Sequence, residues 1–106
     1  MTTNSAAEIL ERHLKALAAG DLDALMRDYA NDAVFISGAT VVRGRDALEK
    51  MFAGVAANPP KIVEDARAAE GDVAYIAWHN DQVAFGTDTF VIRDGKIVCQ
   101  TVGMKV

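Results

Sequence analysis

A hairpin near the C-terminus constrains the fold of this chain more than any other stretch. Apolar and β-branched residues flank the dipeptide Asp94-Gly95 within the segment FGTDTFVIRDGKIVCQT, residues 85–101. Aspartate followed by glycine between two such runs is a strong signal of a tight β-hairpin. One carboxylate, Asp88, stands in the middle of the first predicted strand. The rest of the chain is therefore interpreted as a container built around this strand.

Two registers are open for this hairpin. A two-residue turn at Asp94-Gly95 places Asp88 opposite Thr101. A three-residue turn, which begins at Arg93, places Asp88 opposite Gln100. A slip of one residue moves a whole strand to the other face of the sheet. We favour the three-residue turn, because it gathers on the face of Asp88 the apolar side chains Phe90, Ile92, Val98, Val102 and Met104.

Composition and charge limit the class of protein. The 106 residues predict a single domain, residues 1–106, and the 51% hydrophobic and 25% charged residues are typical of a soluble globular protein. The net charge of −4, with no run of Lys or Arg, argues against nucleic acid or an anionic membrane as a partner. The single cysteine, Cys99, excludes an intrachain disulfide and a cysteine zinc site.

No pattern in the chain indicates a membrane span, a leader or a cofactor. No apolar run reaches membrane-spanning length, and Met1–Ala7 lacks the basic and apolar regions of a signal peptide. We therefore expect a cytoplasmic location. Metal-ligand spacing and a phosphate-binding glycine loop are also missing from the sequence. We expect neither a metal nor another cofactor.

The first half of the chain predicts three helices. The first begins at Asn4 or Ser5 and ends at Gly20, with apolar residues at helical spacing between them. Asp21 caps the second, whose apolar stripe consists of Leu22, Leu25, Met26 and Tyr29. The third begins after Gly44 and stops at the sequence Asn58-Pro59-Pro60.

The strands follow mostly after the helices. Two short extended pieces, Ala33–Ser37 and Thr40–Val42, precede the third helix. The later predicted strands are Ile62–Ala69, Val73–Asn80 and Val83–Arg93, followed by the second arm of the hairpin. Helices first and then a meander of strands predict an α+β fold, with the helices on one face of an antiparallel sheet.

With these elements in place, the chain resembles the nuclear transport factor 2-like superfamily. The matching phrases are AAGDLDALMRDYANDAVFI, VVRGRDALEKMF and FGTDTFVIRDGKIV, and the resemblance is strongest to the small SnoaL-like and ketosteroid isomerase-like proteins. It covers nearly the whole chain. The resemblance implies a cystatin-like, cone-shaped barrel, in which three N-terminal helices pack against a curved antiparallel sheet around a pocket. Fold alone does not fix activity in such a family.

The resemblance also implies roles for particular residues. Asp88 falls where ketosteroid isomerases keep a protonated aspartic acid that donates to the developing oxyanion, and Tyr29 matches a supporting tyrosine of the second helix. His13 stands in place of the principal oxyanion tyrosine, Phe52 in place of a third tyrosine, and Ser37 in place of the general-base aspartate. An unassisted serine is a poor base, so these departures argue against the steroid double-bond shift itself.

The candidate catalytic residues are Asp88 and His13. A carboxylate that meets His13 would orient the imidazole and raise its basicity, giving a general acid or base near neutral pH. Trp78 and His79 alternate on their strand, and we place Trp78 inward, since a large ring suits an apolar pocket. The residues expected to line that pocket and contact the substrate are Tyr29, Phe35, Ser37, Phe52, Trp78, Phe90, Gln100 and Val102.

The sequence therefore predicts a small acid–base enzyme of isomerase, cyclase or dehydratase type. Its partner would be an apolar small molecule that bears a carbonyl or hydroxyl group. A non-catalytic binding module and a dimeric structural domain with a filled core fit the same residues and stay open. We also expect a homodimer through the outer sheet face, a moderately apolar surface without charged residues that consists of Phe85, Thr87, Thr89, Val91, Cys99 and Thr101.

Overall fold

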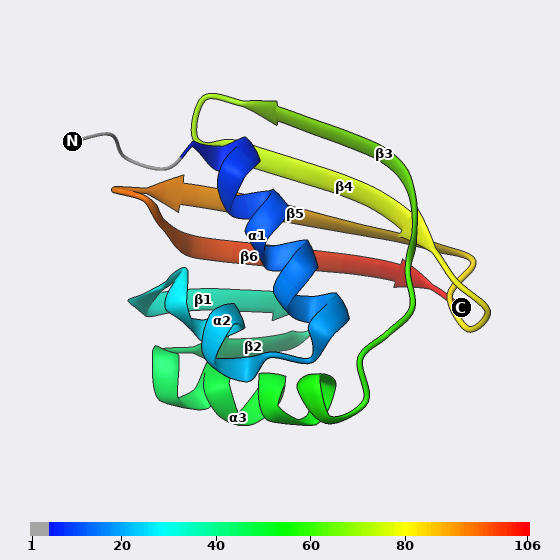
Figure 1. The fold of residues 1–106 in the computed structure, drawn as a ribbon, viewed down its shortest axis with the longest axis horizontal. Helices are drawn as coiled ribbons and strands as arrows, with labels where there is room; N and C mark the ends of the chain where they lie inside the picture. The colour runs from blue at the N-terminus through cyan, green and yellow to red at the C-terminus, as the bar shows by residue number, and fades with distance from the viewer. Residues whose placement is uncertain (1–4) are drawn as a thin grey trace.

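A computed structural model describes residues 5–106. These residues form three helices and six strands (Figure 1). In chain order the elements are α1 (Ala6–Ala19), α2 (Leu22–Arg27), β1 (Tyr29–Ser37), β2 (Thr40–Arg43), α3 (Arg45–Ala57), β3 (Val63–Glu70), β4 (Val73–His79), β5 (Phe85–Arg93) and β6 (Lys96–Lys105). The predicted α+β architecture with three N-terminal helices is confirmed.

The ends of the helices follow the predicted capping chemistry. Ser5 and Glu8 form a capping box at the start of α1, while Asn4 lies outside the described residues. Gly20 closes α1 in the left-handed conformation, with φ of 65°. The Asp21 side chain accepts a hydrogen bond from the backbone N–H of Ala24 at the start of α2.

One helix boundary differs from the prediction. Helix α2 ends at Arg27, and Tyr29 is the first residue of β1 rather than part of the helix. Hydrogen bonds from the hairpin replace a further helical turn. The Lys96 ammonium donates to the carbonyl of Arg27 at 2.6 Å, and the N–H of Ile97 donates to the carbonyl of Asp28 at 2.7 Å. The strand that was predicted from Ala33 therefore begins four residues earlier.

The six strands form one curved, unclosed sheet in the order β2-β1-β6-β5-β4-β3. Every neighbouring pair is antiparallel except β1 and β6, which run parallel. Helix α1 lies across one face of the sheet, and α3 runs beside β2 at its end (Figure 1). Most of the hydrophobic core lies between the helices and this face. None of the described helices has the length and apolar composition needed to cross a bilayer.

The hairpin turn has two residues, so the predicted three-residue turn is wrong. Arg93 pairs with Lys96 around Asp94-Gly95. Both turn residues have positive φ, 53° and 75°, as the favoured two-residue hairpin turn requires. Aspartate tolerates this conformation better than most residues, because its short polar side chain can hydrogen-bond locally.

A β-bulge directly after the turn restores the predicted faces. Ile92 pairs with Ile97, but the next residue, Val91, pairs with Cys99. The extra residue on β6 shifts the register by one, so that Asp88 pairs with Val102 rather than with Gln100 or Thr101. Gln100, Val102 and Met104 therefore lie on the face of Asp88, as predicted. A bulge, and not a longer turn, places them there.

Candidate functional site

A chain of hydrogen bonds joins four of the predicted site residues on the concave face. The indole Nε1 of Trp78 donates to one carboxylate oxygen of Asp88 at 2.9 Å. The amide Nε2 of Gln100 donates to the other oxygen at 2.9 Å. The hydroxyl of Tyr29 in turn donates to the amide oxygen of Gln100. Strands β4, β5, β6 and β1 each contribute one residue to this chain, so the whole width of the central sheet holds it in place.

Asp88 reaches Gln100 diagonally across two strands. Gln100 pairs with Phe90, which is two residues from Asp88 on the same face of β5. Long side chains span such diagonal pairs in antiparallel sheets. Gln100 is 2% exposed, so its amide has no access to water and its hydrogen bonds to Asp88 and Tyr29 are retained.

Gly86 is a residue of this site that the sequence analysis missed. It pairs with Trp78, and the indole lies across it. A β-carbon at Gly86 would lie 2.5 Å from Cε2 and 2.6 Å from Cζ2 of the indole, closer than real contacts allow. The missing side chain therefore lets Trp78 lie flat against β5 and point Nε1 at Asp88. A glycine inside a strand is the sequence signal for such a close approach.

The surroundings of Asp88 raise the pKa of its carboxyl group. Burial against apolar neighbours is the largest cause, and the hydrogen bonds from Trp78 and Gln100 oppose it. Burial also raises the pKa of Tyr29 well above its ordinary value, and the nearby carboxylate of Asp88 adds to the effect. Tyr29 is therefore a neutral hydrogen-bond donor at neutral pH.

His13 lies in the buried core on the same side of the sheet, among aromatic rings. Its ring centroid is 4.9 Å from that of Phe90, 6.2 Å from that of Tyr29 and 6.3 Å from that of Phe52, all at edge-on angles. Phe35 packs edge-on against Phe52 at 6.1 Å. These five side chains therefore pack together as one aromatic cluster in the core.

The imidazole of His13 is buried and short of partners. It is 4% exposed, and its Nδ1 has no hydrogen-bond partner among residues 5–106. Burial lowers the pKa of His13 to about 4, and the charge of Asp28 opposes this shift. The imidazole is therefore neutral at pH 7. A buried polar nitrogen without a partner costs stability.

The predicted direct contact between His13 and Asp88 is not present among the described residues. Both oxygens of Asp88 accept hydrogen bonds from Trp78 and Gln100 instead. Phe90 separates the two groups, since it packs on His13 and lies two residues from Asp88 on the same face. That spacing corresponds to about 7 Å along a strand.

Two other predicted pocket residues, Ser37 and Val102, lie beside Asp88 on neighbouring strands. Ser37 pairs with Val102, which pairs with Asp88, so the three residues cross β1, β6 and β5 side by side. Trp78 is 8% exposed on the inner face, as predicted. His79, predicted to point outward, is partly exposed and contacts Asp65 at 2.8 Å. Within residues 5–106 no cluster of three or more His, Cys, Asp and Glu side chains could hold a metal ion.

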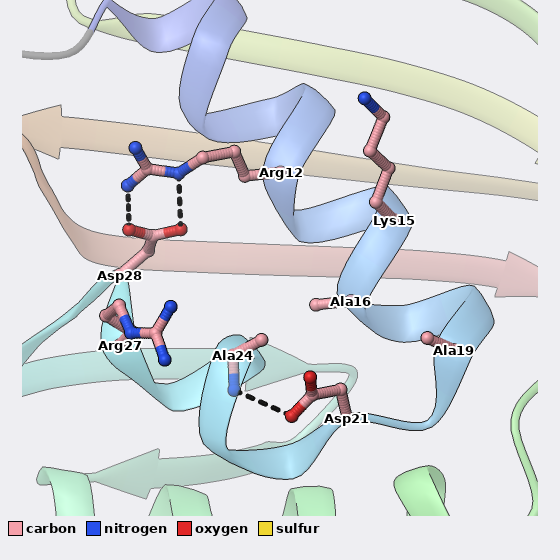
Figure 2. Close-up of a pocket in the computed structure, with 8 residues that line it drawn as sticks. All are labelled: Arg12, Lys15, Ala16, Ala19, Asp21, Ala24, Arg27 and Asp28. Atoms are coloured by element: carbon pink, nitrogen blue, oxygen red, sulfur yellow. Dashed lines mark hydrogen bonds and ion pairs between the residues drawn. The ribbon is translucent and has the colours of Figure 1, made fainter.

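A separate groove of about 400 Å³, away from the aromatic cluster, opens between helices α1 and α2 (Figure 2). Arg12 and Asp28 face each other across it through two parallel hydrogen bonds, as Figure 2 shows. Asp28 is 4% exposed, whereas the Arg12 side chain is partly open to solvent. The full lining consists of Arg12, Lys15, Ala16, Ala19, Asp21, Ala24, Arg27 and Asp28.

The chain belongs to the family of SnoaL-like domains, whose model matches residues 10–100. That span includes every residue of the hydrogen-bonded chain and of the aromatic cluster. The predicted superfamily is thereby confirmed. A comparison with curated proteins finds no match in sequence.

Several solved structures share the fold. A nuclear transport factor 2-like protein of unknown function from Burkholderia xenovorans is 24% identical, with a TM-score of 0.81 over 94% of this chain and 82% of that chain. A putative polyketide cyclase from Sinorhizobium meliloti is 23% identical, with a TM-score of 0.77 over 89% and 92%. The epoxide hydrolase/cyclase-like enzyme SalBIII, of pyran ring formation in salinomycin, is 20% identical, with a TM-score of 0.81 over 95% and 91%. At these identities the likeness shows the fold alone.

Proposed function

We propose that this protein is a small-molecule acid–base enzyme of isomerase, cyclase or dehydratase type. Its substrate would be an apolar molecule with a carbonyl or hydroxyl group, bound against the concave face. The observation that carries the proposal is the state of Asp88, a partly buried carboxyl group with a raised pKa, held by Trp78 and Gln100. Groups with such perturbed titration inside a concave face are candidates for proton transfer.

Asp88 is assigned the role of the proton carrier. Each carboxylate oxygen has two lone-pair sites, and each uses only one for its protein partner, so capacity remains for a substrate proton. The raised pKa makes the carboxylate a stronger proton acceptor than a surface aspartate, and a better match to operation near neutral pH. Tyr29, through Gln100, fixes the orientation of the accepting group.

His13 is assigned to the oxygen of the substrate. As a neutral imidazole with Nδ1 free of protein partners within residues 5–106, it can donate or accept one hydrogen bond without any charge entering the apolar space. Phe90 lies between His13 and Asp88, so its apolar ring separates the two polar groups.

Exchange of α-protons tests this proposal without knowledge of the natural substrate. The probe is 2-tetralone, an apolar ketone, in deuterated water, with loss of its α-proton signals followed by NMR. The wild type should accelerate exchange, and Asp88→Asn should lose that acceleration by about 100-fold, the low end for a general base. Asp94→Asn is the matched control, because it makes the same chemical change in the hairpin turn. Equal rates for the wild type and Asp88→Asn would contradict the proposal.

A non-catalytic binding module is the second candidate. It is favoured by one observation, that both oxygens of Asp88 already accept hydrogen bonds from Trp78 and Gln100. A module of this kind would bind 2-tetralone saturably in an NMR titration and yet exchange its protons no faster than Asp88→Asn does. The same pair of measurements thus separates the two candidates.

A further inference from the structure

Two consecutive residues of helix α1 contact two consecutive residues at the junction of α2 and β1. Arg12 binds Asp28 with two hydrogen bonds, from Nε at 3.2 Å and from Nη2. His13, the next residue, packs its ring edge-on against Tyr29, the residue after Asp28. The first contact faces the groove between α1 and α2 in Figure 2, and the second faces the aromatic interior.

The segment around Asp28 is held firmly from other sides as well. The carbonyl of Asp28 accepts from the N–H of Ile97 at 2.7 Å, and the carbonyl of Tyr29 accepts from the Arg45 guanidinium at 3.1 Å. Asp28 is therefore a fixed anchor, and the planar fork of Arg12 docks α1 on it in one orientation. Because His13 follows Arg12 directly, this orientation also sets the place of the imidazole.

We propose that Arg12 and Asp28 form a positioning pair for His13: the ion pair fixes the imidazole among the three rings, and Arg12 shields the imidazole from the charge of Asp28. This pair extends the proposed function, because Arg12 and Asp28 lie outside the concave face and yet set the position and the pKa of His13. It rests on the role of His13 given above. Its test uses the free protein, so that it can fail or succeed independently of catalysis.

The charged and titratable groups around His13 are few. Asp28 is the charged group whose field raises the pKa of His13. Tyr29, at the start of β1, is neutral. From β5, Asp88 lies on the same face but beyond Phe90, and from α3 the contact is the apolar ring of Phe52. Arg12 on α1 and Arg45 at the start of α3 are the cations nearest in the contacts described.

The proposal predicts opposite effects for the two members of the pair. Arg12→Gln removes the compensating positive charge, so the uncompensated Asp28 should raise the pKa of His13 by about 0.5 to 1 unit, as a nearby opposite charge does. Asp28→Asn removes the negative charge and leaves Arg12, so the same pKa should fall. Arg12→Lys keeps the charge and should leave the pKa within about 0.3 unit of the wild-type value.

The experiment is an NMR titration of the imidazole carbons of His13 in the full chain. Arg67→Gln is the matched control, because Arg67 also ties α1 to the sheet, through Glu11 at 2.6 Å, but touches neither His13 nor Asp28 in the described contacts. It should not move the His13 titration. At pH 4, His13 should be about half protonated in the wild type and mostly neutral in Asp28→Asn.

Two results would overturn the proposal. One is a folded Arg12→Gln whose His13 titration coincides with that of the wild type; the other is a shift in Arg67→Gln equal to that in Arg12→Gln. Should Arg12→Gln not fold, Asp28→Asn decides alone, and an unchanged protonation of His13 at pH 4 refutes the shielding. A shift without any 2-tetralone exchange would support the positioning pair and count only against the proposed function.

Discussion

Replacing Gly86 with alanine should disrupt the Trp78–Asp88 contact, whereas the same change at Gly103, the other strand glycine, should not. The new β-carbon would lie 2.5, 2.6 and 3.0 Å from three atoms of the indole, all of them in the rigid fused ring. The ring cannot bend away, so the whole side chain must rotate or the two strands must separate. Either movement breaks the 2.9 Å hydrogen bond from Nε1 to Asp88.

The expected cost combines two effects. Overpacking in a tight site costs about 1–3 kcal/mol, and a lost hydrogen bond to a charged group costs about 1.5–3 kcal/mol. Because partial relaxation makes these effects overlap, we expect a loss of about 2–4 kcal/mol in the free energy of unfolding. For a domain of this size that corresponds to a fall in Tm of about 10–25 °C. Trp78, 8% exposed in the wild type, should become accessible to iodide quenching.

The assay is urea unfolding followed by Trp78 fluorescence, with Gly103→Ala as the control. Gly103 is also a strand glycine on the sheet, but a β-carbon there would meet its nearest atom, Oγ1 of Thr87, at an ordinary 3.5 Å. Gly86→Ala should be less stable than this control by at least about 1.5 kcal/mol. Equal stability, together with unchanged quenching of Trp78, would refute the assignment of Gly86 as the residue that makes room for the indole.

Three further predictions follow from the same contacts. Below pH 6.5 the unfolded chain protonates His13, whereas the folded chain does so only near pH 4, so the free energy of unfolding should fall by up to about 3 kcal/mol between these pH values. Urea unfolding of His13→Leu should lack this fall, and identical pH profiles for the wild type and His13→Leu would contradict the prediction. Trp78 fluorescence should change saturably with an apolar steroid, flavonoid or polyketide ligand, and no response to all three would count against a ligand at Trp78. We also propose a homodimer through the outer sheet face, where Phe85 is 51% exposed. Light scattering should give a dimer mass for the wild type and a monomer mass for Phe85→Glu. A monomeric wild type would exclude the dimer.

Most of the fold could be predicted because local signals agreed with one another. The capping box at Ser5, the left-handed Gly20 and the cap at Asp21 each depend on a few adjacent residues, and the structure has all three. The end of α2 could not be read in this way. The apolar stripe continues to Tyr29, but hydrogen bonds from Lys96 and Ile97, far along the chain, end the helix at Arg27.

The sequence predicted which side chains share a face of the sheet, but not the contacts between them. The alternation of apolar residues placed Asp88, Trp78 and Gln100 on one face, and the structure joins them. The bulge after the turn left no mark in the sequence, because it preserves the faces while it changes the pairs. The expected contact of Asp88 with His13 was wrong because Phe90, which packs on His13, lies between the two groups.

The central claim is that Asp88 is a proton-exchanging carboxyl group that a ligand can reach. The most direct measurement is a carbon-13 NMR titration of the Asp88 carboxyl carbon, with and without 2-tetralone. The account predicts a pKa above the ordinary 3.8 of aspartate, raised by burial, and a change in that titration when the ketone is added. A pKa at or below 3.8 that does not respond to the ketone would contradict it.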